Sequence, residues 1–289
     1  MKVVLFCGGL GTRLREHSDT IPKPLVNVGD RPIIWHLMRY YAHYGHNEFI
    51  LCLGYGGDLI RSYFLNYNEC MLNNFTLSEG GKRIELESTD LDDWKITFVD
   101  TGLNSNIGTR LQHVRKYLEH EETFLANYAD GLSDLPLDQH IDAFHESGAI
   151  GGFVAVRPQE SFHCVNTEPN GFVTSIESMS GAELRLNGGF FCLKNSIFDY
   201  MRAGEELVEQ PFSRLIAGER LWANRYDGFW ASMDTYKDKV SFDKKHADGN
   251  CPWMVWKRDS LCSVTGCGEE SDGKFDGGID GKVKGIRGI

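Results

Sequence analysis

Several features that would classify this 289-residue chain at once are missing from its sequence. No apolar run approaches the ~20 residues of a membrane-spanning helix, so we expect no membrane partner. The N-terminus carries a single lysine and soon reaches its glycines, which is not the pattern of a signal peptide. Basic residues are outnumbered, with 30 Lys and Arg against 41 Asp and Glu. This balance argues against nucleic acid as a partner, and it means that local cations must hold any anionic ligand.

Clustered cysteines are missing as well. The eight cysteines occur singly at irregular spacing, and Cys7, Cys52 and Cys192 lie in apolar runs, where buried free thiols are common. Cys262 and Cys267 lack a matching set of cysteine and histidine, which disfavours a zinc site. We therefore expect reduced thiols and a cytoplasmic protein.

Short β-branched runs alternate with amphipathic segments along most of the chain. This alternation predicts an α/β fold, with a Rossmann-like, mixed but mostly parallel sheet flanked by helices. We expect one domain over 1–257 and a glycine-rich tail over 258–289 that is disordered or appended. The predicted strands are 2–7, 49–54, 96–102, 123–131 and 149–156, and the predicted helices are 33–44, 57–67, 109–119 and 137–147. Short strands follow over 157–193, and 196–248 is expected to be helical around a strand pair, 221–228 with 229–235.

A glycine-rich turn, "FCGGLGTRLRE" (6–16), follows the first predicted strand. Such a turn points backbone N–H groups at anions, and parallel sheets bind ligands at the carboxyl ends of their strands. Neither common phosphate motif is complete, because Leu14 replaces the third glycine of the dinucleotide fingerprint and no Gly-Lys-Ser/Thr follows. The turn instead supplies Arg13, and "PKP" supplies Lys23, which its two flanking prolines should hold extended. We expect phosphates here; the alternative is a tight turn with solvated cations.

"GGLGTRL", followed shortly by "PKPLVNVGDRPII", resembles the opening of the sugar-phosphate nucleotidyltransferases. "WHLMRYYAHYGHNEFILCLGYGG", "VDTG", "NGGFF" and "GFWASMDTYKDK" are similar, in this order, to the branch that transfers a cytidylyl group to glucose-1-phosphate. The similarity covers roughly 1–257. It implies that a sugar-1-phosphate attacks the α-phosphate of a nucleoside triphosphate, with Mg²⁺ as cofactor and release of pyrophosphate. CTP is favoured; UTP and dTTP stay open, and so does a homo-oligomer.

The resemblance also implies roles for individual residues. Asp130 and Asp234 would hold the metal, since Mg²⁺ prefers one or two carboxylates plus phosphate oxygens, although either could instead form a turn or cap a helix. Arg13, Lys23 and Asp130 are the expected catalytic residues. Ser105 and Arg110 match positions that contact the nucleotide or the sugar phosphate; the alternatives are a capping serine and a solvated arginine. The expected nucleotide-binding residues are Gly8, Gly9, Leu10, Gly11, Thr12, Arg13, Lys23, Ser105, Arg110 and Ala129, the last replacing a glycine of the family motif beside Asp130.

The expected acceptor side departs from the family pattern. The family carries Glu-Lys-Pro before "NGGFF", whereas here Glu177 is followed by Ser178 and Met179, so the lysine that meets the acceptor phosphate is missing. The arginine of the family's "RFG" is missing from "SFHCV" (161–165) as well. We therefore expect a different phosphorylated or phosphonylated acceptor, with Arg185 as a substitute for the lysine. The expected acceptor-binding residues are Glu177, Arg185, Asn187 and Gly188.

Two other function classes stay open. The missing acceptor lysine favours a catalytically weak, nucleotide-binding regulatory protein of the same fold, whereas the retained Lys23, Asp130 and Asp234 favour an enzyme. A Rossmann oxidoreductase is disfavoured by the glycine spacing. Release of pyrophosphate separates the nucleotidyltransferase from both alternatives.

Overall fold

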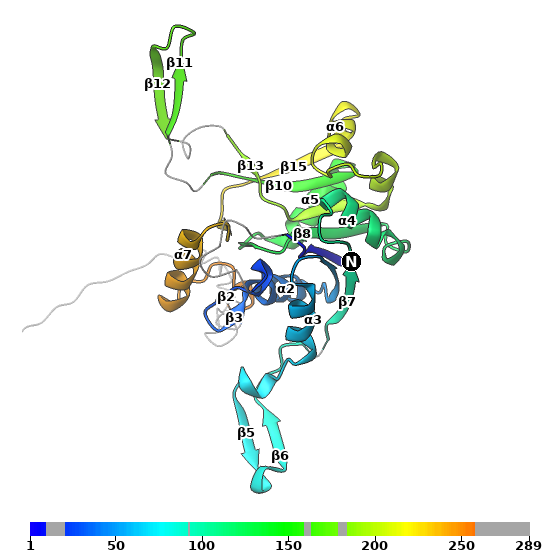
Figure 1. The fold of residues 1–289 in the computed structure, drawn as a ribbon, viewed down its shortest axis with the longest axis vertical. Helices are drawn as coiled ribbons and strands as arrows, with labels where there is room; N and C mark the ends of the chain where they lie inside the picture. Colours follow the sequence, from blue (N-terminus) through cyan, green and yellow to red (C-terminus); the bar gives the residue numbers. More distant parts are fainter. Residues whose placement is uncertain (10–20, 92, 159–162, 179–183, 258–289) are drawn as a thin grey trace, which may run out of the picture. The chain divides into compact units, whose positions relative to one another are not determined.

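A mixed, mostly parallel sheet of eight strands forms the centre of the computed structural model, which describes residues 1–9, 21–91, 93–158, 163–178 and 184–257 (Figure 1). The strand order is β13-β10-β14-β8-β1-β4-β7, and β15 also pairs with β10. The run β8-β1-β4-β7 is parallel and so is the pair β10-β15, whereas β14 is antiparallel to both β8 and β10. The predicted fold class is therefore confirmed. The strands are β1 (Val3–Phe6), β4 (Glu48–Leu53), β7 (Lys95–Asp100), β8 (Thr123–Tyr128), β10 (Gly151–Val156), β13 (Leu186–Asn187), β14 (Phe191–Lys194) and β15 (Leu221–Tyr226).

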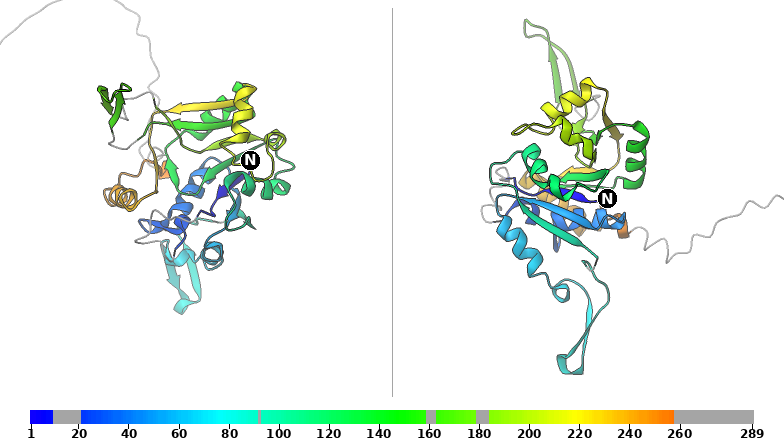
Figure 2. Two further views of the ribbon diagram at one scale, coloured as in Figure 1. Left: turned by 45° about the horizontal axis from the view of Figure 1, so that its top comes forward. Right: turned by 90° about the vertical axis from the view of Figure 1, so that its right-hand side faces the viewer.

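Successive side chains of the central strands enter two separate cores, one on each face of the sheet. In β1, Val3 and Leu5 belong to one core, while Val4 and Phe6 belong to the other, as the two-residue period of a strand requires. Helices α2, α3, α5 and α7 contribute to the first core, and α4 and α6 to the second, so both faces are covered (Figure 2). The helices are α2 (Ile33–His43), α3 (Gly57–Leu65), α4 (Ile107–Val114), α5 (Leu137–Ser147), α6 (Gln210–Ala217) and α7 (Tyr236–Ala247).

The antiparallel strand beside β10 is interrupted. Its first part, β13, pairs with the carboxyl half of β10 (Ala155 with Asn187), and its second part, β14, pairs with the amino half (Gly151 with Leu193). Between them lie Gly189, with a φ of +75°, and Phe190, with a φ of +50°. A positive φ is unusual for a bulky residue, so the chain leaves the regular strand here.

Four short antiparallel pairs complete the described part of the chain. The predicted strand pair within 221–235 is wrong in its pairing, because β15 joins β10 in parallel and β16 joins β9. The hairpin of β5 and β6 was not predicted, since each strand has only four residues, although Phe75 and Leu77 lie opposite Leu86 and Ile84. These strands are β2 (Asn27–Val28) with β3 (Arg31–Pro32), β5 (Phe75–Ser78) with β6 (Arg83–Leu86), β9 (Gly131–Ser133) with β16 (Trp230–Ser232), and β11 (His163–Thr167) with β12 (Val173–Ser178). Single 3-10 turns occupy η2 (Lys23–Leu25), η3 (Glu69–Met71), η4 (Glu79–Gly81) and η5 (Arg115–Tyr117), and a longer one is η6 (Asn195–Tyr200).

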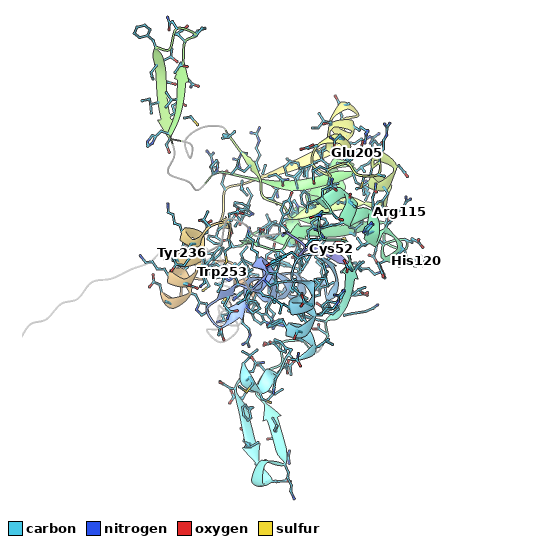
Figure 3. All side chains as sticks on the ribbon, in the orientation of Figure 1. Cys52, Arg115, His120, Glu205, Tyr236 and Trp253 are labelled. Atoms are coloured by element: carbon cyan, nitrogen blue, oxygen red, sulfur yellow. The ribbon has the colours of Figure 1, made fainter. Side chains whose placement is uncertain are left out.

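The last described residues close the first core. Trp253 is fully buried, and its ring packs edge-on against Phe242 of α7, with 5.4 Å between the ring centroids (Figure 3). Met1–Trp256 forms one unit, and the predicted tail over 258–289 lies outside the described residues. Within the described ranges, no helix is long and apolar enough to cross a bilayer.

Candidate functional site

The parallel strands bring several loops to one edge of the sheet. Strands β1, β4, β7, β8, β10 and β15 all run in one direction, so their carboxyl ends share an edge. The glycine-rich turn follows β1, and Asp130 follows β8 after a single intervening residue. This is the edge at which open α/β sheets bind ligands.

Lys23 lies between two carboxylates at this edge. Its ammonium donates to Asp130 Oδ2 at 2.5 Å and to Asp234 Oδ1 at 2.8 Å. The lysine side chain is only 13% exposed, whereas that of Asp234 is 42% exposed. The structure thus brings together three predicted residues that are distant in the sequence. We call Lys23, Asp130 and Asp234 the lysine-centred triad.

Local pairing explains why the two aspartates meet. Strand β16 runs antiparallel to β9 with Ser232 opposite Gly131, so the residues next to these strands are neighbours. The N–H of Met233 donates to the carbonyl of Asp130 at 2.9 Å, and Ser232 Oγ donates to Asp234 Oδ2 at 2.8 Å. Thr235 follows at once and caps α7. Asp234 is therefore fixed between a strand pair and a helix start.

The expected extended conformation of Lys23 is wrong. Lys23–Leu25 forms a 3-10 turn, closed by the N–H of Val26 donating to the carbonyl of Lys23 at 3.1 Å. The fixed φ of Pro24 suits this turn as well as it suits an extended chain. The turn and its hydrogen bond still restrict the backbone of Lys23.

Electrostatics keep Lys23 charged. Burial by itself would lower the pKa of its ammonium, but the nearby Asp130 and Asp234 outweigh burial and raise the pKa above its usual value. One positive and two negative charges leave the triad with a net charge of −1. Two carboxylates that converge on one cation fit the ligand preference of Mg²⁺, which takes one or two carboxylates and completes its shell with water and phosphate oxygens. Among the described residues, no group of three or more His, Cys, Asp or Glu offers a self-sufficient metal site.

Arg110 braces the loops at this edge. Its guanidinium donates to the carbonyls of Gly8 at 3.0 Å, Leu53 at 3.1 Å and Gly102 at 3.0 Å, and to Thr101 Oγ1 at 2.7 Å. Arg110 is 3% exposed, so the alternative of a solvated arginine is wrong. The side chain ties together the carboxyl ends of β1, β4 and β7, which makes it a positioning residue. A direct contact with a nucleotide stays a prediction.

The start of the glycine-rich turn is shaped by Arg110. A Cβ on Gly8 would lie 2.1 Å from Nη1 of that side chain, so a larger residue would displace the guanidinium from its carbonyl acceptors. Gly9 is exposed. The predicted nucleotide contacts of Leu10, Gly11, Thr12 and Arg13 lie outside the described residues.

Two further nucleotide-side predictions have structural explanations. Ser105 Oγ donates to the carbonyl of Thr101 at 2.5 Å, while Asn106, not Ser105, caps α4. Ala129 is 3% exposed and its side chain belongs to the first core. Its methyl group therefore packs inward, and contacts of Ser105 and Ala129 with a nucleotide stay predictions.

Of the predicted acceptor-binding residues, Asn187 and Gly188 contact side chains of β8 and β16. Asn187 Nδ2 lies 3.5 Å from the hydroxyl of Tyr128, two residues before Asp130. The indole of Trp230 donates to the carbonyl of Gly188 at 2.8 Å, and a Cβ on Gly188 would lie 3.0 Å from Cγ1 of Val156. Close contacts with Trp230 and Val156 thus explain why residue 188 is a glycine, without any contact to an acceptor.

Glu177 and Arg185 occupy different surroundings. Glu177 is exposed on β12, opposite Cys164 in the β11–β12 hairpin. Arg185 donates to the carbonyls of Ala155 at 3.0 Å and Tyr226 at 3.3 Å, and to Asp227 Oδ1 at 3.0 Å. The role of Glu177 stays a prediction. Asp227 was missed because an isolated aspartate after a strand carries no distinguishing sequence pattern.

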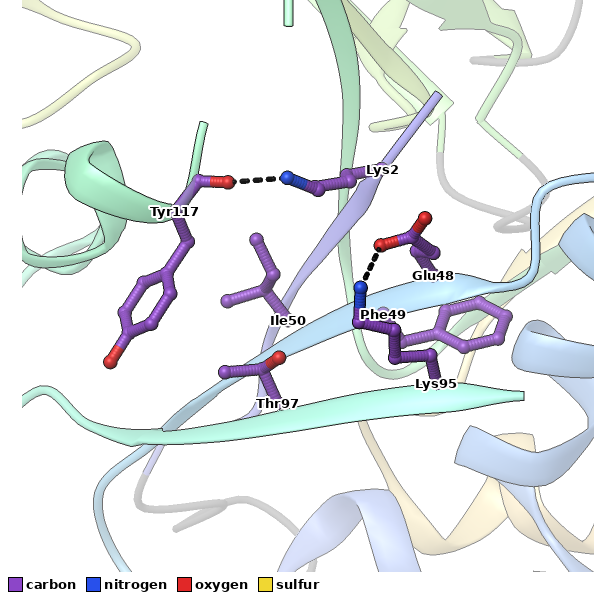
Figure 4. A pocket seen from close by; sticks show the side chains of 7 residues that line it. All are labelled: Lys2, Glu48, Phe49, Ile50, Lys95, Thr97 and Tyr117. Atoms are coloured by element: carbon purple, nitrogen blue, oxygen red, sulfur yellow. Dashed lines mark hydrogen bonds and ion pairs between the residues drawn. The ribbon is translucent and has the colours of Figure 1, made fainter. Parts of the chain in front are cut away.

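A small cavity lies at the opposite edge of the sheet. It measures about 130 Å³ and is lined at the amino ends of β1, β4 and β7 (Figure 4). Lys95 pairs with Glu48 at 2.9 Å, and Lys2 donates to the carbonyl of Tyr117 at 2.8 Å. It is therefore separate from the lysine-centred triad. Its lining residues are Lys2, Glu48, Phe49, Ile50, Lys95, Thr97 and Tyr117.

Comparison with known proteins agrees with this geometry. Residues 2–213 match the family described as Nucleotidyl transferase. The chain is 36% identical over 259 residues to the "Probable glucose-1-phosphate cytidylyltransferase" of Bacillus subtilis, which covers 89% of this chain and 100% of that protein. It is also 36% identical over 258 residues to the "Glucose-1-phosphate cytidylyltransferase" of Salmonella typhi, with the same coverage.

A solved structure supports the fold. The UDP-glucose pyrophosphorylase from Acinetobacter baumanii superposes with a TM-score of 0.64 at 20% identity, covering 91% of this chain and 99% of that one. Sequence match and fold agree, and the triad lies at the edge where this fold binds ligands. The chain belongs to the nucleotidyl transferase family.

Proposed function

We propose that this nucleotidyltransferase transfers a cytidylyl group from CTP to the phosphate of a sugar-1-phosphate or a related acceptor. An oxygen of the acceptor phosphate forms a bond to the α-phosphorus of CTP, the bond from that phosphorus to the β-phosphate oxygen breaks, and pyrophosphate leaves. No protein nucleophile is needed. The observation that carries the proposal is Lys23 held between Asp130 and Asp234 at the carboxyl edge of the sheet.

The chain's own residues have separate tasks in this reaction. Lys23 supplies a fixed positive charge close to the reacting phosphates, because its raised pKa keeps it protonated at neutral pH. Asp130 and Asp234 orient Lys23 and are the residues that would hold Mg²⁺. When bound, Mg²⁺ supplies charge neutralisation for the phosphates. Arg110 keeps the start of the glycine-rich turn in place.

Several finer points belong to the same proposal. We infer CTP as the nucleotide from the two cytidylyltransferases that share 36% of their residues with this chain. A cytoplasmic location is supported by the six cysteines in the described part of the chain, all of which are free thiols. A homo-oligomer stays part of the proposal and is checked by light scattering.

The test measures pyrophosphate release with Mg²⁺, using CTP, UTP, dTTP, ATP and GTP against glucose-1-phosphate and other phosphates and phosphonates. We expect turnover with CTP, and we expect Asp130→Asn to lower it at least ~100-fold, the scale of losing one electrostatic contact in an active site. The matched control is Asp199→Asn, because Asp199 is an exposed aspartate on η6. Nucleotide binding without pyrophosphate release from any pair would contradict the proposal and support the regulatory alternative.

A further inference from the structure

Two arginines meet one aspartate at the ends of three neighbouring strands. Arg157 follows β10, Asp227 follows β15 and Arg185 precedes β13. Val156 is paired with both Tyr226 and Leu186, so the next residue on each strand falls in one row. Asp227 Oδ1 accepts from Arg157 Nε at 2.8 Å and from Arg185 Nη2 at 3.0 Å. We call Arg157, Asp227 and Arg185 the aspartate-centred triad.

The aspartate-centred triad is locally positive on an acidic protein. Two guanidinium groups and one carboxylate give a net charge of +1, whereas the whole chain carries −11. Arg157, followed by Arg185, lowers the pKa of Asp227, so the carboxylate is charged at neutral pH. The net negative charge of the chain repels anions, so a local group of cations such as this one is needed to attract an anion to the surface.

This triad lies on the acceptor side of the catalytic edge. Strand β10 is separated from β8 by one intervening strand, β13 followed by β14, and neighbouring strands lie about 4.8 Å apart. The end of β10 is thus about 10 Å across the sheet from the end of β8, which leads to Asp130. Asn187 lies between them, near the Tyr128 hydroxyl. A sugar phosphate that reacts beside Lys23 and lies over Asn187 would point its far end at Arg157.

The surrounding contacts hold the triad in place while leaving it accessible. Arg185 also donates to the carbonyls of Ala155 and Tyr226, so its guanidinium spans the ends of β10 and β15. Asp134 accepts from the N–H of Phe229 at 2.8 Å and thereby fixes the loop that carries Asp227. In contrast to Arg185, which is 17% exposed, the Arg157 side chain is 47% exposed. A ligand can therefore reach Arg157 without unfolding the loop.

We propose that Arg157 and Arg185 bind a second anionic group of the acceptor, remote from the phosphate that reacts. The inference rests on the proposed function and names its substrate class, a sugar phosphate that carries a further carboxylate or phosphate. Guanidinium groups pair with either anion through parallel N–H donors. Arg185 lies two residues before Asn187, a predicted acceptor-binding residue, and Arg157 shares Asp227 with Arg185, so both arginines place positive charge beside the predicted acceptor site.

The experiment compares three acceptors with CTP and Mg²⁺: glucose-1-phosphate, glucuronate-1-phosphate and glucose-1,6-bisphosphate. We expect a higher kcat/KM for one or both acidic acceptors; which of them is preferred separates a carboxylate from a phosphate. Arg157→Gln should lower kcat/KM for the preferred acidic acceptor about tenfold relative to glucose-1-phosphate, which corresponds to about 1.4 kcal/mol. Arg83→Gln is the matched control, because Arg83 is exposed on β6 and ion-paired with Glu85.

Two outcomes overturn the inference. The first is an equal kcat/KM for glucose-1-phosphate and for the two acceptors that carry a second anionic group, and the second is an equal loss for all three acceptors in the Arg157 variant. Titration calorimetry with the same three sugar phosphates separates this failure from failure of the proposed function. If no acceptor releases pyrophosphate but the acidic ones bind more tightly and lose this advantage in Arg157→Gln, the arginine site stands without the reaction. If binding shows no preference either, the arginine site is wrong.

Discussion

The two triads at one edge of the sheet have opposite arrangements of charge. In the first, one lysine lies between two aspartates; in the second, one aspartate lies between two arginines. The first has a net charge of −1 and the second a net charge of +1. The lysine-centred triad can therefore accept a further cation, whereas the aspartate-centred triad can accept a further anion.

The two triads also differ in exposure. The central Lys23 side chain is 13% exposed, whereas the central Asp227 side chain is 58% exposed. Charges act more strongly where water is excluded, so the less exposed centre of the lysine-centred triad suits stabilisation of a developing charge. Exposed charges are weakened by solvent and salt, which suits selection among ligands rather than chemistry.

The largest effect is expected when the lysine-centred triad loses its central lysine. Lys23→Gln removes the cation and leaves Asp130 and Asp234 facing each other, so pyrophosphate release should fall about 100- to 1,000-fold. Lys95→Gln is the matched control, since Lys95 is also paired with a carboxylate but is 72% exposed. Initial rates with CTP check both variants. If both lose activity equally, the contrast between a buried and an exposed lysine is wrong.

Two buried histidines, His36 and His140, should make the folded state sensitive to acid. His36 Nε2 lies 3.0 Å from the Val28 carbonyl, and its Nδ1 accepts from Trp253 Nε1 at 3.4 Å. His140 Nε2 lies 2.9 Å from the Phe190 carbonyl, and its Nδ1 lies 3.1 Å from Asn224 Nδ2. Each ring thus donates through Nε2 and accepts through Nδ1, as only a neutral imidazole can.

Burial lowers the pKa of both His36 and His140 to about 4. An unfolded histidine titrates near 6.5, so below that pH the unfolded chain binds more protons and the folded state loses stability. The contribution is fully present above pH 6.5 and is lost as the pH falls to about 4, at a cost of about 3 kcal/mol for each histidine. Urea unfolding at pH 7.5 and pH 4.5 measures the loss. In His140→Gln about a third of the difference should disappear, because burial also lowers the pKa of His46 to about 4, so three histidines contribute. An unchanged difference would contradict the assignment.

The smallest effect is expected at the centre of the exposed triad. Asp227→Asn removes the carboxylate that competes with a ligand for Arg157 and Arg185, so KM for an acidic acceptor should fall by about threefold, the modest scale of exposed charge pairs. KM for glucose-1-phosphate should not change in this variant. A rise in KM for the acidic acceptor would mean that Asp227 positions the arginines more than it competes with the ligand.

Local patterns in the sequence predicted most of the central fold. Helix α2 begins at Ile33 after a proline and ends before Gly45, and β4 and β10 coincide with apolar runs, because burial on both faces makes such strands continuous in hydrophobicity. The partners of the strands within 221–235 were not predictable in this way. Strand pairing depends on which strand edges, distant in the sequence, are available. Strand β15 pairs with β10 and β16 pairs with β9, so the two do not pair with each other.

Within the candidate site, residue identity was easier to predict than residue role. Lys23, Asp130 and Asp234 were predicted as members of the site, but their meeting depends on a strand register between β9 and β16 that no local pattern encodes. Arg110 was predicted to contact the nucleotide or the sugar phosphate, and that contact stays a prediction. The structure adds a role that the sequence did not indicate, because three strand ends leave carbonyl acceptors that its buried guanidinium pairs with. Arg157 was not predicted as a site residue, because only the strand register places it beside Asp227 and Arg185.

The interruption between β13 and β14 has a consequence for how this enzyme can diverge. Strand β14 is fixed on both sides, by β8 and β10, whereas β13 is paired with the last residues of β10. A gain or loss of two residues at 188–190 would slide Asn187 and Arg185 by about 6.6 Å along their strand and keep them on the same face, without altering the register of the central sheet. The spacing between the lysine-centred triad and the residues of β13 can thus change during evolution while the central sheet stays the same.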